Sequence, residues 1–126
     1  MNAHAVAARA VYARPESPQK TPRSLEYDVI ARVTQRLSLA WATRQRDGVA
    51  LIAALSENLR LWSTLAGDVA DPGNGLPPPL RAQLFYLYEF TDQHSRAVRD
   101  GKASAEVLID INTAVLRGLR GDGGGR

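Results

Sequence analysis

Few side chains in this 126-residue sequence are of types that could do chemistry. The chain has no cysteine, so thiolate nucleophiles, thiolate metal ligands and disulfides are excluded, and His4 and His94 are the only imidazoles. Ser95 follows His94, but adjacent helical residues lie about 100° apart around the axis and do not face each other. We find no phosphate-binding loop and no metal-ligand or triad spacing. We therefore predict no catalytic residue, no metal site, no cofactor and no enzyme activity.

Three polar residues, Asn58, His94 and Asn112, interrupt apolar stripes instead of forming a reactive group. Each lies on the side of its expected helix that carries the regularly spaced apolar residues. Buried amides and imidazoles usually bond to one another or to nearby backbone, with a net value of about 1 kcal/mol each, and they can fix helix register. We predict that these three side chains form buried polar packing.

Helical periodicity defines the elements that would hold these residues. We expect helices from Thr21 to about Thr43, from the turn at Gly48 to the DPGNGLPPP segment, from Leu80 to a left-handed cap at Gly101, and from a Ser104 cap to Leu119. The helix from Thr21 is expected to bury Leu25, Val29, Ile30, Val33, Leu37 and Trp41. The helix from Gly48 is expected to bury Ile52, Leu55, Leu59, Trp62, Leu65 and Val69. No segment shows sustained strand alternation. We predict an all-α fold, a small antiparallel helical bundle of four main helices with a short N-terminal helical arm.

Proline and glycine divide the chain into three parts. Residues 1–20 are expected to be an N-terminal helical arm and Pro-rich linker, residues 21–120 the helical bundle domain, and residues 121–126 a disordered Gly-rich tail. No apolar run reaches the roughly 18 residues of a membrane span, and the N-terminus lacks a charged leader followed by an apolar block. We expect a cytoplasmic protein that does not engage a membrane.

The stretch LFYLYEFTDQHSRAVRDG, residues 84–101, is apolar on nearly every side in its first half. Leu80, Leu84, Leu87 and Val98 already form a core stripe, so the rings of Phe85, Tyr86 and Phe90 point elsewhere. A helix that is apolar all round is covered on more than one side, either by neighbours in its own bundle or by a partner. Both possibilities remain open at the level of sequence.

The basic residues are nearly all arginine, and they concentrate in the first half of the chain. The 16 basic residues include only two lysines, Lys20 and Lys102. Arginine can bind phosphate or carboxylate with two hydrogen bonds, although codon bias explains such a composition more simply. Arg32 and Arg36 flank an apolar stripe and form no separate basic face, so direct nucleic-acid binding is not favoured.

Several separated motifs resemble the flagellar biosynthesis regulator family FlaF. They are MNAHAVAARAVY, SPQKTPRSLEYDVIARVT and the long stretch from NLRLWSTLAGDVADPGNGLPPPLRAQLFYLYEF to INTAVLRGLRG, in the family's order. The resemblance implies a small cytoplasmic protein without enzyme activity or cofactor. It also implies a role in promoting flagellin synthesis or export, alongside the FlbT family of flagellin repressors.

Two functional hypotheses follow. In the first, the protein is a flagellin-binding, chaperone-like regulator. Its apolar groove includes Phe85, Tyr86 and Phe90, with arm residues Val6 and Val11 beside it.

In the second hypothesis, the protein is a post-transcriptional regulator acting through RNA or an RNA-bound partner. The residues of that electrostatic site would be Arg23, Arg32, Arg36, Arg44 and Arg46. Salt separates the two, because phosphate binding weakens steeply as salt rises whereas an apolar groove responds little.

Overall fold

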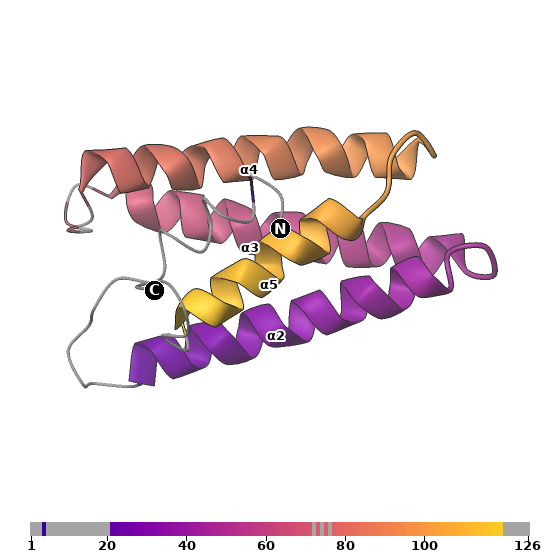
Figure 1. Ribbon diagram of the computed structural model, residues 1–126, viewed down its shortest axis with the longest axis horizontal. Coiled ribbons are helices and arrows are strands. Elements are labelled where there is room, and N and C mark those ends of the chain that lie inside the picture. Colours follow the sequence, from indigo (N-terminus) through magenta and orange to yellow (C-terminus); the bar gives the residue numbers. More distant parts are fainter. Residues whose placement is uncertain (1–3, 5–20, 72, 74, 76, 120–126) are drawn as a thin grey trace.

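Four helices make up most of the chain that the structure, a computed structural model, describes: His4 and residues 21–71, 73, 75 and 77–119. The helices are α2 (Thr21–Ala42), α3 (Gly48–Ala70), α4 (Pro78–Arg99) and α5 (Glu106–Leu119). His4 is also helical, and no strand occurs among the described residues. Consecutive helices run in alternating directions, with α2 and α4 at opposite edges of the view in Figure 1. The fold is all-α, as the periodicity predicts.

Local signals set the ends of the helices that carry the aromatic stretch. α4 begins at Pro78, slightly before the predicted Leu80, because a proline is tolerated in the first helical turn. After α4, Gly101 has φ +73°, which confirms the predicted left-handed cap. The Ser104 hydroxyl then accepts a hydrogen bond from the Glu106 backbone N–H at 2.9 Å, which confirms the predicted cap of α5.

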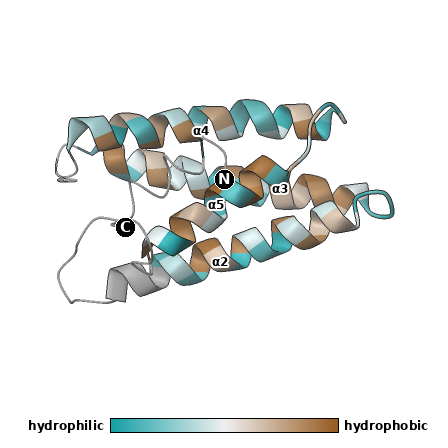
Figure 2. Ribbon diagram, in the orientation of Figure 1, coloured by the Kyte–Doolittle hydropathy of each residue, from teal (hydrophilic) through white to brown (hydrophobic). Residues whose placement is uncertain are grey.

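The core consists of two adjoining clusters of apolar side chains. One surrounds Trp62, Leu84 and Ile111, and the other contains Leu37, Leu55 and Leu108. Figure 2 shows apolar and polar residues sharing the described helices, as expected of helices that bury one side. None of the helices in the described ranges is long and apolar enough to cross a membrane.

Two residues that the periodicity assigns to the buried sides are exposed, and the prediction is wrong for both. Val29 is 39% exposed and Ile52 is 50% exposed. Their sequence neighbours Ile30 and Leu51 are buried. Because neighbours on a helix differ by about 100° in direction, the burial of Ile30 and Leu51 turns Val29 and Ile52 toward solvent. Leu59 and Trp41 are half-buried.

The four helices leave one edge of the bundle less tightly packed. α2 packs extensively against α3 and α5, and α3 packs extensively against α4, whereas α4 and α5 are not a pair in extensive contact. In Figure 1, α4 and α5 diverge from their connection at residues 100–105. The backbones of α4 and α5 thus approach each other less closely than those of the other neighbouring helices, although Leu84 and Leu87 share a core cluster with Ile111 and Val115.

Candidate partner-binding site

The side of α4 next to this edge carries Tyr86, Phe90 and His94 at helical spacings of four residues. Phe90 is half-buried and packs against both core clusters, while Tyr86 is 50% exposed. The Phe90 and His94 rings stack with centroids 5.1 Å apart and an interplanar angle of 21°. We call the surface formed by these three residues the aromatic edge.

His4, from the other end of the sequence, lies on the aromatic edge. Its ring stacks on that of Phe90 with centroids 3.8 Å apart and an interplanar angle of 20°. Its Nε2 is 2.7 Å from the Tyr86 hydroxyl oxygen, within hydrogen-bonding distance. The imidazole therefore makes both an apolar and a polar contact, the combination that an aromatic surface with a hydroxyl at its rim can offer an added segment.

His94 anchors the aromatic edge to the connection between α4 and α5. Its Nε2 lies 2.7 Å from the Ser104 carbonyl oxygen, and because a carbonyl only accepts, the imidazole N–H donates. The ring is half-buried, less enclosed than the buried packing predicted from the sequence. One face stacks on Phe90, so His94 belongs to the surface as well as to the interior.

The surroundings of His4 lower its pKa from the ordinary value of about 6.5. Partial burial is the larger cause, since it disfavours the charged imidazolium, and the nearby His94 contributes through charge repulsion. A lowered pKa means that the neutral ring is favoured in the contact. The contribution of this contact is therefore fully present above the ordinary pKa and is lost as pH falls through the lowered pKa.

We expect the His4 imidazole to titrate below the pKa of a free histidine when followed by NMR in the folded protein. His94→Gln should raise the His4 pKa only part of the way to the free value, because it removes the charge repulsion from His94 while the His4 ring stays partly buried. Tyr86→Ala is the comparison. It removes the hydrogen-bonding hydroxyl and weakens the contact of His4 with α4, so the His4 pKa should move toward the free value. A His4 pKa unchanged by both substitutions and equal to that of free histidine would contradict the stacked arrangement.

Phe85 lies apart from the other two rings predicted to share its site. It lines a pocket of about 340 Å³ with Val69, Ala70, Pro78 and Arg81, where the end of α3 meets the start of α4. Phe90 lies five positions after Phe85, which places them about 140° apart around the helix. The structure thus brings Tyr86, Phe90 and His94 together and leaves Phe85, 39% exposed, on the opposite flank. The predicted arm contacts Val6 and Val11 lie outside the described residues.

Asn58 and Asn112 are buried and bonded to each other in the centre of the bundle. Asn112 Nδ2 donates to Asn58 Oδ1 at 2.8 Å, and the Trp62 indole N–H donates to Asn112 Oδ1 at 2.9 Å. All three side chains are at most 1% exposed. This chain of hydrogen bonds joins α3 to α5 and is internal, so it offers no binding surface.

The arginines of the alternative electrostatic site are dispersed. Arg36 forms an ion pair with Glu57 of α3. The Arg44 guanidinium lies 3.9 Å from the centre of the Trp41 ring and donates to the Trp41 carbonyl oxygen. Arg32 and Arg46 are exposed, and the side chain of Arg23 lies outside the described residues. Two of the predicted arginines are therefore already engaged within the protein.

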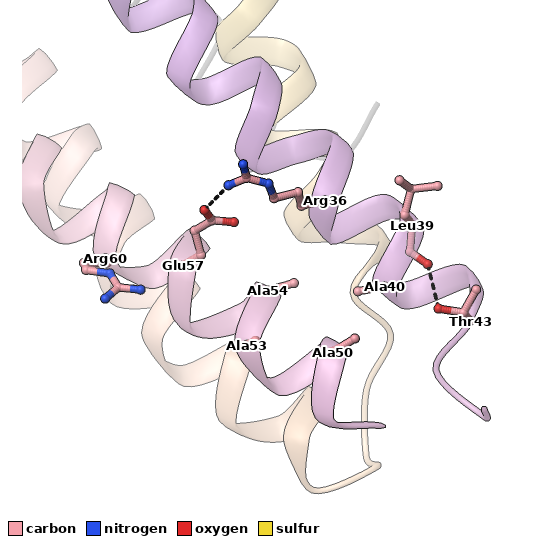
Figure 3. A pocket seen from close by; sticks show the side chains of 9 residues that line it. All are labelled: Arg36, Leu39, Ala40, Thr43, Ala50, Ala53, Ala54, Glu57 and Arg60. Carbon is pink, nitrogen blue, oxygen red and sulfur yellow. Dashed lines mark hydrogen bonds and ion pairs between the residues drawn. The ribbon is translucent and has the colours of Figure 1, made fainter. Parts of the chain in front are cut away.

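A second concave surface, which we call the alanine groove, lies between α2 and α3. Its volume is about 520 Å³. The lining residues are Arg36, Leu39, Ala40, Thr43, Ala50, Ala53, Ala54, Glu57 and Arg60. Figure 3 shows the three α3 alanines across from Ala40 of α2 and from Thr43 in the turn that follows α2, with the Arg36–Glu57 ion pair bridging the two helices.

Sequence reasoning missed both His4 on the aromatic edge and the alanine groove. His4 is separated from Tyr86 by 82 positions, and no local spacing signals a contact over that distance. The groove did leave a signal, because Ala50, Ala53 and Ala54 follow the spacing of one helix face. In the described part of the chain, no group of three or more histidine and acidic side chains could hold a metal ion.

A family model matches most of the chain. It is described as Flagellar protein FlaF, and the match covers residues 8–119. No curated protein and no solved structure gives a significant match.

Proposed function

Because the chain belongs to the flagellar protein FlaF family, we propose that it is a non-enzymatic cytoplasmic regulator that promotes flagellin synthesis and export by binding flagellin as a chaperone-like protein. The aromatic edge would hold an amphipathic segment of flagellin that is otherwise exposed before assembly. Residues from both α4 and the connection to α5 would contact this segment.

The observation that carries this proposal is the seating of His4 on Phe90 and Tyr86. It supports the view that the open edge of the bundle accepts a side chain from a segment outside the four helices. The half-exposed Tyr86 ring and the outer face of Phe90 offer apolar area with one hydroxyl for orientation. Such a surface fits the apolar side of an amphipathic helix, which buries its anchors at spacings of three and four residues.

The energetics favour binding of moderate strength. Aromatic side chains bury large areas, and covering two such rings can supply several kcal/mol of favourable free energy. Ordering a flagellin segment and displacing His4 both oppose this gain. A net value near 8 kcal/mol would correspond to a micromolar dissociation constant, which permits release of flagellin at the export stage.

The test is titration calorimetry of purified flagellin monomer with three forms of this protein. Tyr86→Asp should weaken binding by at least about tenfold, because it removes an aromatic contact and places a charge on an apolar surface. Phe85→Asp is the matched control, since it changes the adjacent, similarly exposed ring on the other flank of α4, and it should leave the affinity unchanged. Both substituted positions are exposed, so both variants are expected to stay folded.

Salt and arginine substitutions distinguish the electrostatic alternative. Binding through the aromatic edge should change little between low and high salt, and Arg32→Gln/Arg36→Gln should retain it. Loss of binding in the arginine variant, together with a steep salt dependence, would favour the alternative. Unchanged binding by Tyr86→Asp would remove the aromatic edge from the flagellin site. The involvement of a FlbT-family repressor remains a prediction of the family relationship.

A further inference from the structure

The alanine groove is a second concave surface, formed by different helices from the aromatic edge. Ala50, Ala53 and Ala54 of α3 face Ala40 of α2, so short side chains leave the space of about 520 Å³ between the two helices. Residues 50–60 of α3 extend over roughly 15 Å, about three helical turns. The groove is thus long enough for a short helix to lie along it.

An exposed apolar side chain lies at the rim of the groove. Leu39, which lines the groove, is 60% exposed. Shallow grooves with small residues on the floor admit the ridge of larger side chains on another helix and allow the two axes to approach within about 8–10 Å. The shape and the rim both fit an apolar helix face.

Charge determines which kind of helix fits. The residues that line the groove include two arginines, Arg36 and Arg60, and one acidic residue, Glu57, and Asp47 lies just before α3. Asp47 Oδ1 accepts a hydrogen bond from the Ala50 N–H at the start of α3, and Glu57 is paired with Arg36. Among the described residues no acidic side chain forms an ion pair with Arg60, which lies one turn beyond Glu57 at the end of the groove. The unpaired charge at this groove is therefore positive, on the Arg60 guanidinium.

We propose that the alanine groove docks an acidic amphipathic helix from a partner protein, whose apolar residues fill the groove and whose carboxylates pair with Arg60. A second copy of this chain fits less well, because pairing two such surfaces would bring like charges together. This docking is independent of flagellin binding at the aromatic edge. The protein would then hold two different partners on two different surfaces.

The experiment uses two stapled helical peptides of about 16 residues as probes, since isolated helices of this length are marginal in water. Both carry leucine at positions i, i+4, i+7 and i+11, and the flanking positions are glutamate in one peptide and lysine in the other. Binding to the full-length protein is followed by NMR. We expect the glutamate peptide to shift the amide signals of Ala50, Ala53 and Ala54, and to bind about fivefold or more tightly than the lysine peptide.

Three variants make the result specific. Arg60→Glu should reverse the preference between the two peptides, which a general loss of structure would not do. Ala53→Trp should abolish binding by filling the groove from an exposed position, and Ser63→Trp, exposed and outside the groove lining, should retain it. Equal binding of both peptides, or shifts that map to Tyr86 and Phe90, would overturn the proposal. Concentration-dependent shifts of the groove alanines without peptide would overturn it in favour of self-association.

Discussion

Replacing Trp62 with alanine is expected to lower the free energy of unfolding by about 3–5 kcal/mol, a large fraction of the stability of a domain of this size. The indole is 1% exposed and lies in the cluster that joins α2, α3, α4 and α5. Truncation leaves a large cavity and also orphans the Asn112 carbonyl oxygen that accepts the indole N–H. The thermal midpoint should fall by more than about 10 °C.

The second tryptophan provides the matched control. Trp41 is half-buried at the edge of the other cluster, and one face of its ring is covered by the Arg44 guanidinium instead of by core residues. Trp41→Ala should therefore cost less than half as much as Trp62→Ala. Chemical denaturation of both variants measures the difference, and equal losses would show that the assignment of Trp62 to the centre of the core is wrong.

The second large effect is expected at Asn112. Its carboxamide uses both ends, accepting from Trp62 Nε1 at 2.9 Å and donating to Asn58 Oδ1 at 2.8 Å. Asn112→Leu removes both bonds and leaves two buried polar groups without partners, at about 1–3 kcal/mol each. We expect a loss of about 2–5 kcal/mol in the free energy of unfolding, measured by urea denaturation.

Asn58→Leu is the comparison that isolates this mechanism. Asn58 Nδ2 is buried and has no hydrogen-bond partner among the described residues, so its removal also eliminates an unsatisfied donor. Only the Asn112 amide would be left without a partner. Asn58→Leu should therefore cost clearly less than Asn112→Leu. The reverse order would indicate that the carboxamide chain contributes through shape and not through satisfied hydrogen bonds.

The sequence predicts the helices well because their signals are local. The Gly101 and Ser104 caps, and the burial of Leu37, Leu55 and Trp62, follow from turn chemistry and from periods of three and four residues. The exposed Val29 and Ile52 show the limit of this reasoning, since periodicity defines a wide apolar face without saying how much of it neighbours cover. How much is covered depends on tertiary packing.

The candidate sites are harder to predict because they depend on contacts distant in sequence. Phe85 and Phe90 look alike in the sequence, yet about 140° of helix rotation places one at the end of α3 and the other under His4. The contact between His4 and Tyr86 spans most of the chain. Likewise, nothing in the spacing of Arg36 indicates that Glu57 is its partner, since that pair forms only when α2 and α3 pack together.

The placement of Asn112 on α5, the last of the four described helices, has a consequence for biosynthesis. α5 is translated after the other three helices, yet it supplies the acceptor for Trp62 and the donor for Asn58. Until residues 106–119 leave the ribosome, the Trp62 indole and the Asn58 amide of the nascent α3 lack the hydrogen-bond partner that α5 provides. At about 5–20 residues per second the chain spends several seconds in this incomplete state. The core cluster that α5 shares with α2 and α3 therefore forms only after α5 has left the ribosome.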